Sequence, residues 1–250
     1  MKINEIFNIP KECEVGSKIP KKQFYENANL KTRDKSIFTD NIHKILWCYS
    51  LKEENIRITE YKDSIRDYKE VEIFHVSLKK ADKINRIADV ILRTITYPTL
   101  IIFQFNNKIQ LFVAHKKEHL SDSSKVTLEE IISTEWIDLE NLDNIDKKLF
   151  ESLQLENLSF SNFYKFYSDI VDNINVYNAS KAVGRDLALG VKLSPDEIKE
   201  IKDEIDRIND EISLKRNQSK KETQFNKQME FNIEIHNLQE EIKKLEGRLV

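Results

Sequence analysis

The chain of 250 residues carries 40 Lys and Arg against 43 Asp and Glu, which gives a net charge of −3. This near-balance provides no overall attraction to nucleic acid or to an anionic membrane, although local basic patches can still form. The two cysteines lack metal-ligand spacing and the four glycines lack the spacing of a phosphate loop, so we expect no metal and no cofactor. No signal peptide and no apolar run of about 18 residues is present, which predicts a cytoplasmic protein.

The N-terminal third predicts an arm, one helix and two strands. Residues 1–30 are broken by proline and glycine, which is typical of an irregular segment laid across a domain. Apolar residues recur at helical spacing over 32–50 and predict a helix packed on a sheet. Residues 55–59 and 71–78 show the pattern of strands, and a charged loop joins them.

The centre of the fold is predicted at residues 97–116. Two runs rich in branched and aromatic residues flank an Asn-Asn pair, and asparagine tolerates the positive φ that a two-residue hairpin turn needs. The first run, 100–103, is wholly apolar, as in a strand that is covered on both faces. A helix capped by Asp82 is predicted just before this hairpin, over 82–96.

The segment after the hairpin predicts more helix than strand. We expect a short helix or turn over 127–130, a last strand over 131–139, and helices over 144–153 and 160–189. The order α-β-β-α-β-β-β-α-α predicts an α+β fold, in which a mostly antiparallel or mixed five-stranded sheet packs against helices. This α/β globular domain with its N-terminal arm is assigned to residues 1–190.

Residues 191–250 predict an antiparallel helical hairpin with coiled-coil character. Apolar residues from Ile198 to Ile212, and again from Ile235 to Leu249, step by three and four positions. The 23 residues from Ile212 to Ile235 put the two seams out of register on a single helix, and the interval is mostly polar. These features favour a turn near 217–221. One continuous helix that joins two chains in a homodimer is the alternative.

Two short motifs suggest chemistry, but neither is complete. His115-Lys-Lys-Glu118-His119 matches a zinc motif that requires both histidines on one helical face, yet here it follows a strand, so we interpret it as a chance match. Ser77-Leu78-Lys79 stands where a restriction-type nuclease has Glu-x-Lys, with Asp67 as the upstream acid. The missing carboxylate removes a key metal ligand. We therefore predict no catalytic residue and expect no enzyme, while a degenerate nucleic-acid-binding relative stays open.

Two binding surfaces are predicted instead. One is a nucleic-acid-binding surface made of cations near the helix at 82–96 and at the exit of the hairpin, which could contact phosphate groups. The same cations also fit an ordinary solvent-exposed helix face. They are Lys79, Lys80, Lys83, Arg86, Arg93, Lys116 and Lys117. Apolar residues of the tail are predicted to contact a partner protein: Ile198, Ile205, Ile212, Phe225, Met229, Phe231, Ile235 and Ile242.

Several short stretches resemble a bacterial family, domain of unknown function DUF 4391. They include the segment from Asn4 to Pro10, Tyr97-Pro98, Ala114-His-Lys116, Trp136-Ile-Asp-Leu139 and Gln224-Phe-Asn226. The resemblance covers nearly the whole chain. The family has no established activity, so the resemblance implies no catalytic residue. Its members are often encoded beside SNF2-type helicases and DNA methyltransferases, which implies an accessory role in DNA processing or anti-phage defence.

Three hypotheses about function follow. The leading hypothesis is a non-catalytic accessory subunit that binds a helicase or methyltransferase partner and contacts DNA, if at all, through that partner. The alternative is a nuclease-like nucleic-acid-binding domain that uses Asp67, Lys79 and the basic helix. The third is a coiled-coil homodimer that acts as a scaffold.

Overall fold

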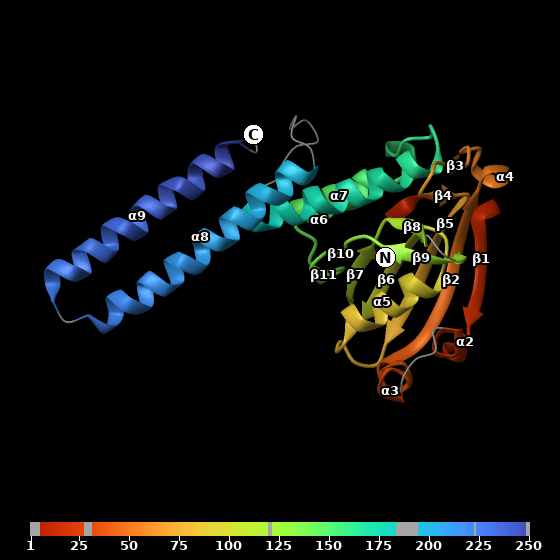
Figure 1. The fold of residues 1–250 in the computed structure, drawn as a ribbon, viewed down its shortest axis with the longest axis horizontal. Coiled ribbons are helices and arrows are strands. Elements are labelled where there is room, and N and C mark those ends of the chain that lie inside the picture. The colour runs from red at the N-terminus through yellow and green to blue at the C-terminus, as the bar shows by residue number, and fades with distance from the viewer. Residues whose placement is uncertain (1–5, 28–31, 120–121, 184–194, 223, 249–250) are drawn as a thin grey trace. The chain divides into compact units, whose positions relative to one another are not determined.

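The computed structural model describes residues 6–27, 32–119, 122–183, 195–222 and 224–248 (Figure 1). The chain divides into two compact units, Met1–Ile174 and Asn175–Val250. This division lies within helix α7 (Phe163–Val183). The predicted boundary at residues 190 and 191 lies outside the described residues.

The first unit is built on a mixed sheet, and the predicted α+β fold class is confirmed. The main path of the sheet is β1-β2-β5-β6-β7-β10, and β11 also pairs with β7. Among the described strands, only β5 and β6 pair in parallel, and helix α5 makes the crossover that such a pair requires. The bounds are β1 (Glu14–Ile19), β2 (Ile42–Lys52), β5 (Glu70–Leu78), α5 (Ile84–Thr94), β6 (Thr99–Phe105), β7 (Lys108–Val113), β10 (Ile132–Ser133) and β11 (Ile137–Asp138).

Smaller elements surround this sheet (Figure 1). Two short hairpins, β3 with β4 and β8 with β9, form two-stranded sheets of their own. The bounds are η1 (Lys11–Cys13), α2 (Lys21–Asn27), α3 (Thr32–Asn41), α4 (Glu53–Ile56), β3 (Tyr61–Lys62), β4 (Asp67–Tyr68), β8 (Lys116–His119), β9 (Asp122–Leu128), α6 (Asn144–Ser152) and η2 (Leu155–Asn157).

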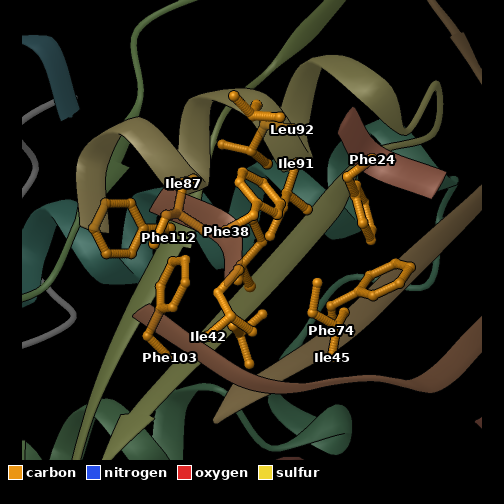
Figure 2. Packing of buried hydrophobic residues seen from close by; sticks show 14 of the residues in the cluster. Phe24, Phe38, Ile42, Ile45, Phe74, Ile87, Ile91, Leu92, Phe103 and Phe112 are labelled. Carbon is orange, nitrogen blue, oxygen red and sulfur yellow. The ribbon is translucent and has the colours of Figure 1, made fainter. Parts of the chain in front are cut away.

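The main core lies between helix α5 and one face of the sheet. Ile87 and Ile91 on the inner face of α5 are fully buried over Phe103 and Phe112, and Phe38 of α3 joins the same cluster (Figure 2). The two sheet phenylalanines meet edge to face, with ring centroids 5.3 Å apart. Burial of this apolar face is the main source of the domain's stability.

The opposite face of the sheet is also buried. Ile73, Leu100, Ile102 and Leu111 lie on it and are at most 2% exposed. We assign its cover to the first half of α7, because the Tyr167 hydroxyl of α7 hydrogen-bonds to the backbone of β6 and of the residue after β7. The central strands are thus covered on both faces, as the wholly apolar run at 100–103 predicts.

The predicted hairpin at the centre of the fold is confirmed. Strands β6 and β7 pair with Phe105 opposite Lys108, which leaves Asn106 and Asn107 as the two-residue turn. Asn106 has a φ of 53°, the left-handed conformation that asparagine tolerates better than most residues.

The helix predicted over 32–50 is wrong in its second half. Helix α3 ends at Asn41, and Ile42 begins the long strand β2. The pairing of β2 with β5 shifts register twice, between Ile42 and Lys44 and between Trp47 and Tyr49. Such bulges interrupt the two-residue alternation of a strand, so that its buried residues fall at positions 42, 45 and 48. That spacing imitates a helix in the sequence.

Other local predictions also require correction. The N-terminal segment contributes the edge strand β1 and the helix α2 instead of an irregular arm. Residues 53–56 form helix α4 where a strand was expected to begin, and β9 continues to Leu128 where a helix was expected. The last predicted strand is split into β10 and β11. The predicted strand at 55–59 does not form. The other four predicted strands, together with β1, β2 and the division of the last strand, give the seven strands of the described sheet.

The second unit contains the predicted antiparallel helical hairpin, formed by α8 (Pro195–Lys221) and α9 (Phe225–Arg248). The apolar seam is formed by Ile201, Ile205, Ile208 and Ile212 of α8, which pack with residues of α9 such as Ile235. An ion pair of 2.7 Å between Lys215 and Glu234 joins the helices nearer the turn. Because α8 continues to Lys221, the turn lies later than the predicted 217–221.

Candidate functional site

A pocket of about 310 Å³ opens beside the first half of strand β5. Its floor carries Glu70 and Glu72 of β5 together with Trp47 of β2 and Phe74. One wall is the end of α5 and the segment after it, and the other wall is formed by β1 and α2. We call this cavity the Glu72 pocket.

Pairing of the strands places polar residues in rows across the sheet. Glu70 and Glu72 share one face of β5 because side chains alternate along a strand. The register sets Lys52 opposite Glu70, and Ser50 opposite Glu72. Thr99 of β6 lies on the other side of Glu72. Both glutamates are buried, at 8% and 3% exposure, on the face that elsewhere carries the apolar core.

The two carboxyl groups are linked through one hydroxyl. The Ser50 Oγ lies 3.0 Å from Glu70 Oε2 and 3.1 Å from Glu72 Oε1. A serine hydroxyl has a single proton and can donate to only one of them at a time. A proton on the second carboxyl group would satisfy the other contact. The indole N–H of Trp47 donates to the remaining oxygen of Glu72.

The two glutamates have different charge partners. The Lys52 ammonium lies 3.0 Å from Glu70, and the Tyr97 hydroxyl also hydrogen-bonds to that carboxylate. Glu72 makes no ion pair with any other described residue. Burial, with a further contribution from the negative charge of Glu70, raises the pKa of Glu72 from 4.5 to about 7. Glu72 therefore titrates near neutral pH.

The raised pKa of Glu72 predicts that stability falls as pH rises. The folded state holds a proton that the unfolded state releases, so the stabilising contribution is complete below pH 4.5 and lost as pH rises through about 7. We expect the free energy of unfolding to decrease by about 2 kcal/mol between pH 5 and pH 8, relative to Glu72→Gln, as measured by urea denaturation. An equal pH dependence of the two proteins would contradict this assignment.

Lys116 lies behind the pocket wall instead of on a nucleic-acid-binding surface. Its side chain is 2% exposed, and its ammonium group donates to the carbonyl oxygens of Ile95 and Tyr97 and to Thr99 Oγ1. Burial holds the pKa of Lys116 well below its ordinary value. Its predicted contact with phosphate is therefore wrong, because the ammonium group is buried and hydrogen-bonded to groups inside the protein.

The remaining predicted cations are on the surface, but acids engage several of them. Arg86 forms ion pairs of 2.7 Å with Asp34 and with Asp89, and Arg93 forms one with the same Asp89. Lys117 pairs with Glu129 at 3.0 Å. The other three are exposed: Lys79, whose ammonium donates to a backbone carbonyl, Lys80, and Lys83, which lies near Asp82. The helix therefore presents alternating charges more than a uniform basic stripe.

The residues compared with a nuclease site are not brought together. Asp67 precedes β5 and pairs with Lys62 at 2.9 Å, whereas Ser77 and Lys79 lie at the far end of this strand. A nine-residue strand separates these positions by roughly 25–30 Å. No metal site can therefore include both Asp67 and Lys79.

The histidine motif lies in a strand context. His115 precedes β8, which contains Glu118, so the helical face that the zinc motif requires is not present. The ring of His115 hydrogen-bonds to the Tyr68 hydroxyl at 3.0 Å, and burial lowers its pKa to about 4. The side chain of His119 lies outside the described part. Within the described part of the chain, no three His, Cys, Asp or Glu side chains are grouped to hold a metal.

The partner-binding residues predicted in the tail divide into two groups. Ile205, Ile212 and Ile235 are buried within the second unit, where they hold the hairpin together. Ile242 and Phe231 are partly buried, and Met229 is 45% exposed. The side chains of Ile198 and Phe225 lie outside the described part.

Sequence reasoning missed the pocket, although one signal was present. Glu72 shares a strand face with Phe74, Val76 and Leu78, and a charged residue in line with core residues calls for a buried partner or a ligand. The sequence could not predict that Trp47 and Tyr97 line the same pocket as Glu72, because only the tertiary structure places these residues close together.

The fold and the pocket together define a mixed α+β domain with a buried acidic pocket, followed by a helical hairpin. The model of a family described as "Domain of unknown function (DUF4391)" matches residues 7–242, and the chain belongs to that family. Comparison with curated proteins and with solved structures finds no match. No helix in the described part has the length and apolarity needed to span a bilayer.

Proposed function

We propose that this chain is a non-catalytic accessory subunit that binds a protein partner, namely a helicase or methyltransferase subunit of a DNA-processing or anti-phage defence complex. The observation that carries the proposal is the composition of the turn end of the α8–α9 hairpin, which we define as residues 213–229. This segment combines excess positive charge with exposed apolar side chains. The gene neighbourhoods implied by the family supply the candidate partners.

Charge is distributed unevenly along the hairpin. The turn end contains five cations against the single acid Glu222, whereas residues 196–212 contain eight acids against three cations. Lys215 is engaged by Glu211 and Glu234. Arg216, Lys220 and Lys227 are exposed and form no ion pair with another described residue. These three cations are therefore available to an acidic partner surface.

Exposed apolar side chains occur in or near the same segment. Leu214 is 63% exposed and Met229 is 45% exposed, and Ile233, one turn beyond Met229, is 55% exposed. Protein interfaces combine such apolar side chains with charged groups that steer association. A surface that binds only nucleic acid contacts mainly phosphate groups, and exposed aliphatic side chains contribute little to such contacts. A protein with an acidic, partly apolar surface is therefore the better match.

Reversing charge at the turn end should weaken partner binding. We expect the triple variant Arg216→Glu, Lys220→Glu and Lys227→Glu to reduce affinity for the partner at least tenfold. The loss should appear mainly in the association rate and its salt dependence, because exposed charges act on the encounter. The measurement is surface plasmon resonance against the purified products of the neighbouring genes, at two salt concentrations.

A matched control separates local from overall charge effects. The variant Lys11→Glu, Lys108→Glu and Lys147→Glu makes the same charge change at exposed positions of the first unit. It should bind the partner as the unaltered chain does. Equal loss in both variants, or no loss in the turn-end variant, would exclude the hairpin turn as the contact. Failure of the unaltered chain to bind any neighbouring product would overturn the accessory role.

Direct nucleic-acid binding, the alternative function, has less support. Lys116 is buried and the two arginines of helix α5 are paired with aspartates, so the predicted patch retains few available cations. Fluorescence anisotropy with labelled duplex and single-stranded DNA at low salt tests this alternative. Binding that is lost on Lys79→Glu and Lys80→Glu, but kept in the turn-end variant, would favour it over the proposed role.

A further inference from the structure

We propose that the Glu72 pocket binds a small organic amine, a ligand that carries a protonated nitrogen on an apolar body. The proposal concerns the first unit alone and does not depend on what the hairpin binds. It rests on the shape of the cavity, on its aromatic wall and on a buried carboxyl group that has no cation beside it.

The cavity is of a size and composition that suit a small molecule. A volume of about 310 Å³ lies at the lower end of the range of ligand pockets, which are mostly apolar with a few convergent polar groups. Ile19, Phe24, Phe74 and Ile95 provide the apolar walls. The polar groups converge at the floor, where Glu72 lines the pocket. An elongated ligand would thus place its charged end at the floor and its apolar body between the walls.

Aromatic rings stand beside the carboxyl group. The rings of Trp47 and Phe74 stack with centroids 6.2 Å apart and planes 6° apart, and both line the pocket. Aromatic faces attract cations through the ring quadrupole and also pack well against apolar groups. The Trp47 N–H is already directed to Glu72, which fixes the orientation of both side chains.

The charge balance of the pocket leaves a place for a cation. Glu70 is paired with Lys52. Lys116 acts on Glu72 only at a distance, since its ammonium group donates to Ile95, Tyr97 and Thr99. Glu72 thus has hydrogen-bond donors but, among the described residues, no ion-pair partner. A buried carboxylate without a counter-charge is unfavourable, and a ligand cation would supply one.

Other ligand classes fit less well. An anion would meet two buried carboxyl groups, which repel it. A divalent metal needs several oxygen or nitrogen ligands, and no group of three such side chains exists among the described residues. A neutral apolar molecule would leave Glu72 without a new partner. An organic amine is the class of ligand that can pack its apolar body against the walls and pair its charge with Glu72 at the floor.

Binding of such a ligand is coupled to a proton. The charged or titratable groups around Glu72 are Glu70 on the same strand, Lys52 on β2, Tyr97 after α5 and Lys116 after β7. From β1 and α2, the described pocket wall contains no charged side chain. With a pKa of about 7, the Glu72 carboxyl group is mostly protonated at pH 6 and mostly ionised at pH 8. A cation binds the ionised form, so binding releases a proton.

The test is a calorimetric titration of the full-length protein with phenethylammonium chloride, which keeps its charge throughout this pH range. We expect saturable binding that is about tenfold tighter at pH 8 than at pH 6, because the ionised fraction of Glu72 rises by about that factor. Titrations in two buffers with different ionisation enthalpies should show a proton released near pH 7. The neutral analogue 2-phenylethanol and the anion phenylacetate should bind at least tenfold more weakly.

Two variants locate the site. Glu72→Gln keeps the size of the side chain and its contacts with Trp47 and Ser50 but removes the charge, and should abolish both tight binding and its pH dependence. Thr96→Trp fills the rim of the pocket without altering the carboxyl group, and should also abolish binding. The control Glu12→Gln removes one exposed charge elsewhere and should bind as the unaltered chain does. Circular dichroism confirms that each variant is folded.

Three outcomes of these titrations would contradict amine binding in the Glu72 pocket. Absence of saturable binding up to about 10 mM amine would overturn it, since affinity would then be negligible. Equal affinity for 2-phenylethanol would show that the cation is not recognised. Binding that survives in both folded pocket variants would place the ligand elsewhere on the protein.

Discussion

Replacing Lys116 with alanine should lower the free energy of unfolding by about 3 kcal/mol. The substitution leaves the carbonyl oxygen of Ile95 without its side-chain donor, and an unsatisfied buried group costs roughly 1–3 kcal/mol. It also removes one hydrogen bond each from the Tyr97 carbonyl and the Thr99 hydroxyl, which stay bonded to one another. Loss of the buried aliphatic stem adds a cavity. Relief from burying a charge offsets part of this cost. The measurement is urea denaturation followed by circular dichroism.

Two companion variants separate these contributions. Lys116→Met keeps most of the stem and removes only the ammonium group, so it should be intermediate between the unaltered chain and Lys116→Ala. Lys117→Ala, at a half-buried position with one ion pair to Glu129, should cost less than about 1 kcal/mol. If Lys116→Ala were within 1 kcal/mol of the unaltered chain, the hydrogen bonds of Lys116 would not be important for stability.

Replacing Phe103 with alanine should lower the free energy of unfolding by about 4 kcal/mol. The side chain is fully buried at the centre of the sheet, under helix α5 and edge to face with Phe112 (Figure 2). Its removal loses the transfer free energy of a phenyl ring and leaves a cavity that close-packed neighbours fill only in part. Thermal and urea denaturation should agree on the loss.

The matched control for this prediction is Phe160→Ala. Phe160 is 47% exposed and precedes helix α7, so its truncation removes much less buried surface. We expect a change below about 1 kcal/mol. A loss of similar size in both variants would mean that the buried cluster around Phe103 is not the main core.

How far the sequence predicts this fold depends on how local each signal is. The β6–β7 hairpin and the strand at 70–78 were predictable, because an Asn-Asn turn and runs of branched residues act through neighbouring positions. Helix α5 was predictable for the same reason. Strand β2 was not, since two register shifts gave it the periodicity of a helix.

The candidate site was predictable only in part. A glutamate in line with core residues on a strand face marks Glu72 as unusual, but the sequence contains no sign of the cavity beside it. The basic residues chosen from the sequence shared a region of the chain, yet Lys116 points inward and Arg86 is paired with an acid contributed by α3. Burial and pairing depend on residues far apart in the sequence.

The sequence by itself determined the α+β class, the central hairpin, helix α5 and the antiparallel helices of the tail. These features follow from local turn chemistry and from apolar periodicity within single segments. The tertiary structure alone decided the seven-stranded order, the burial of Lys116 and the Glu72 pocket. Each of these arises where separate strands and helices meet, and long-range packing selects among arrangements that the local sequence permits equally well.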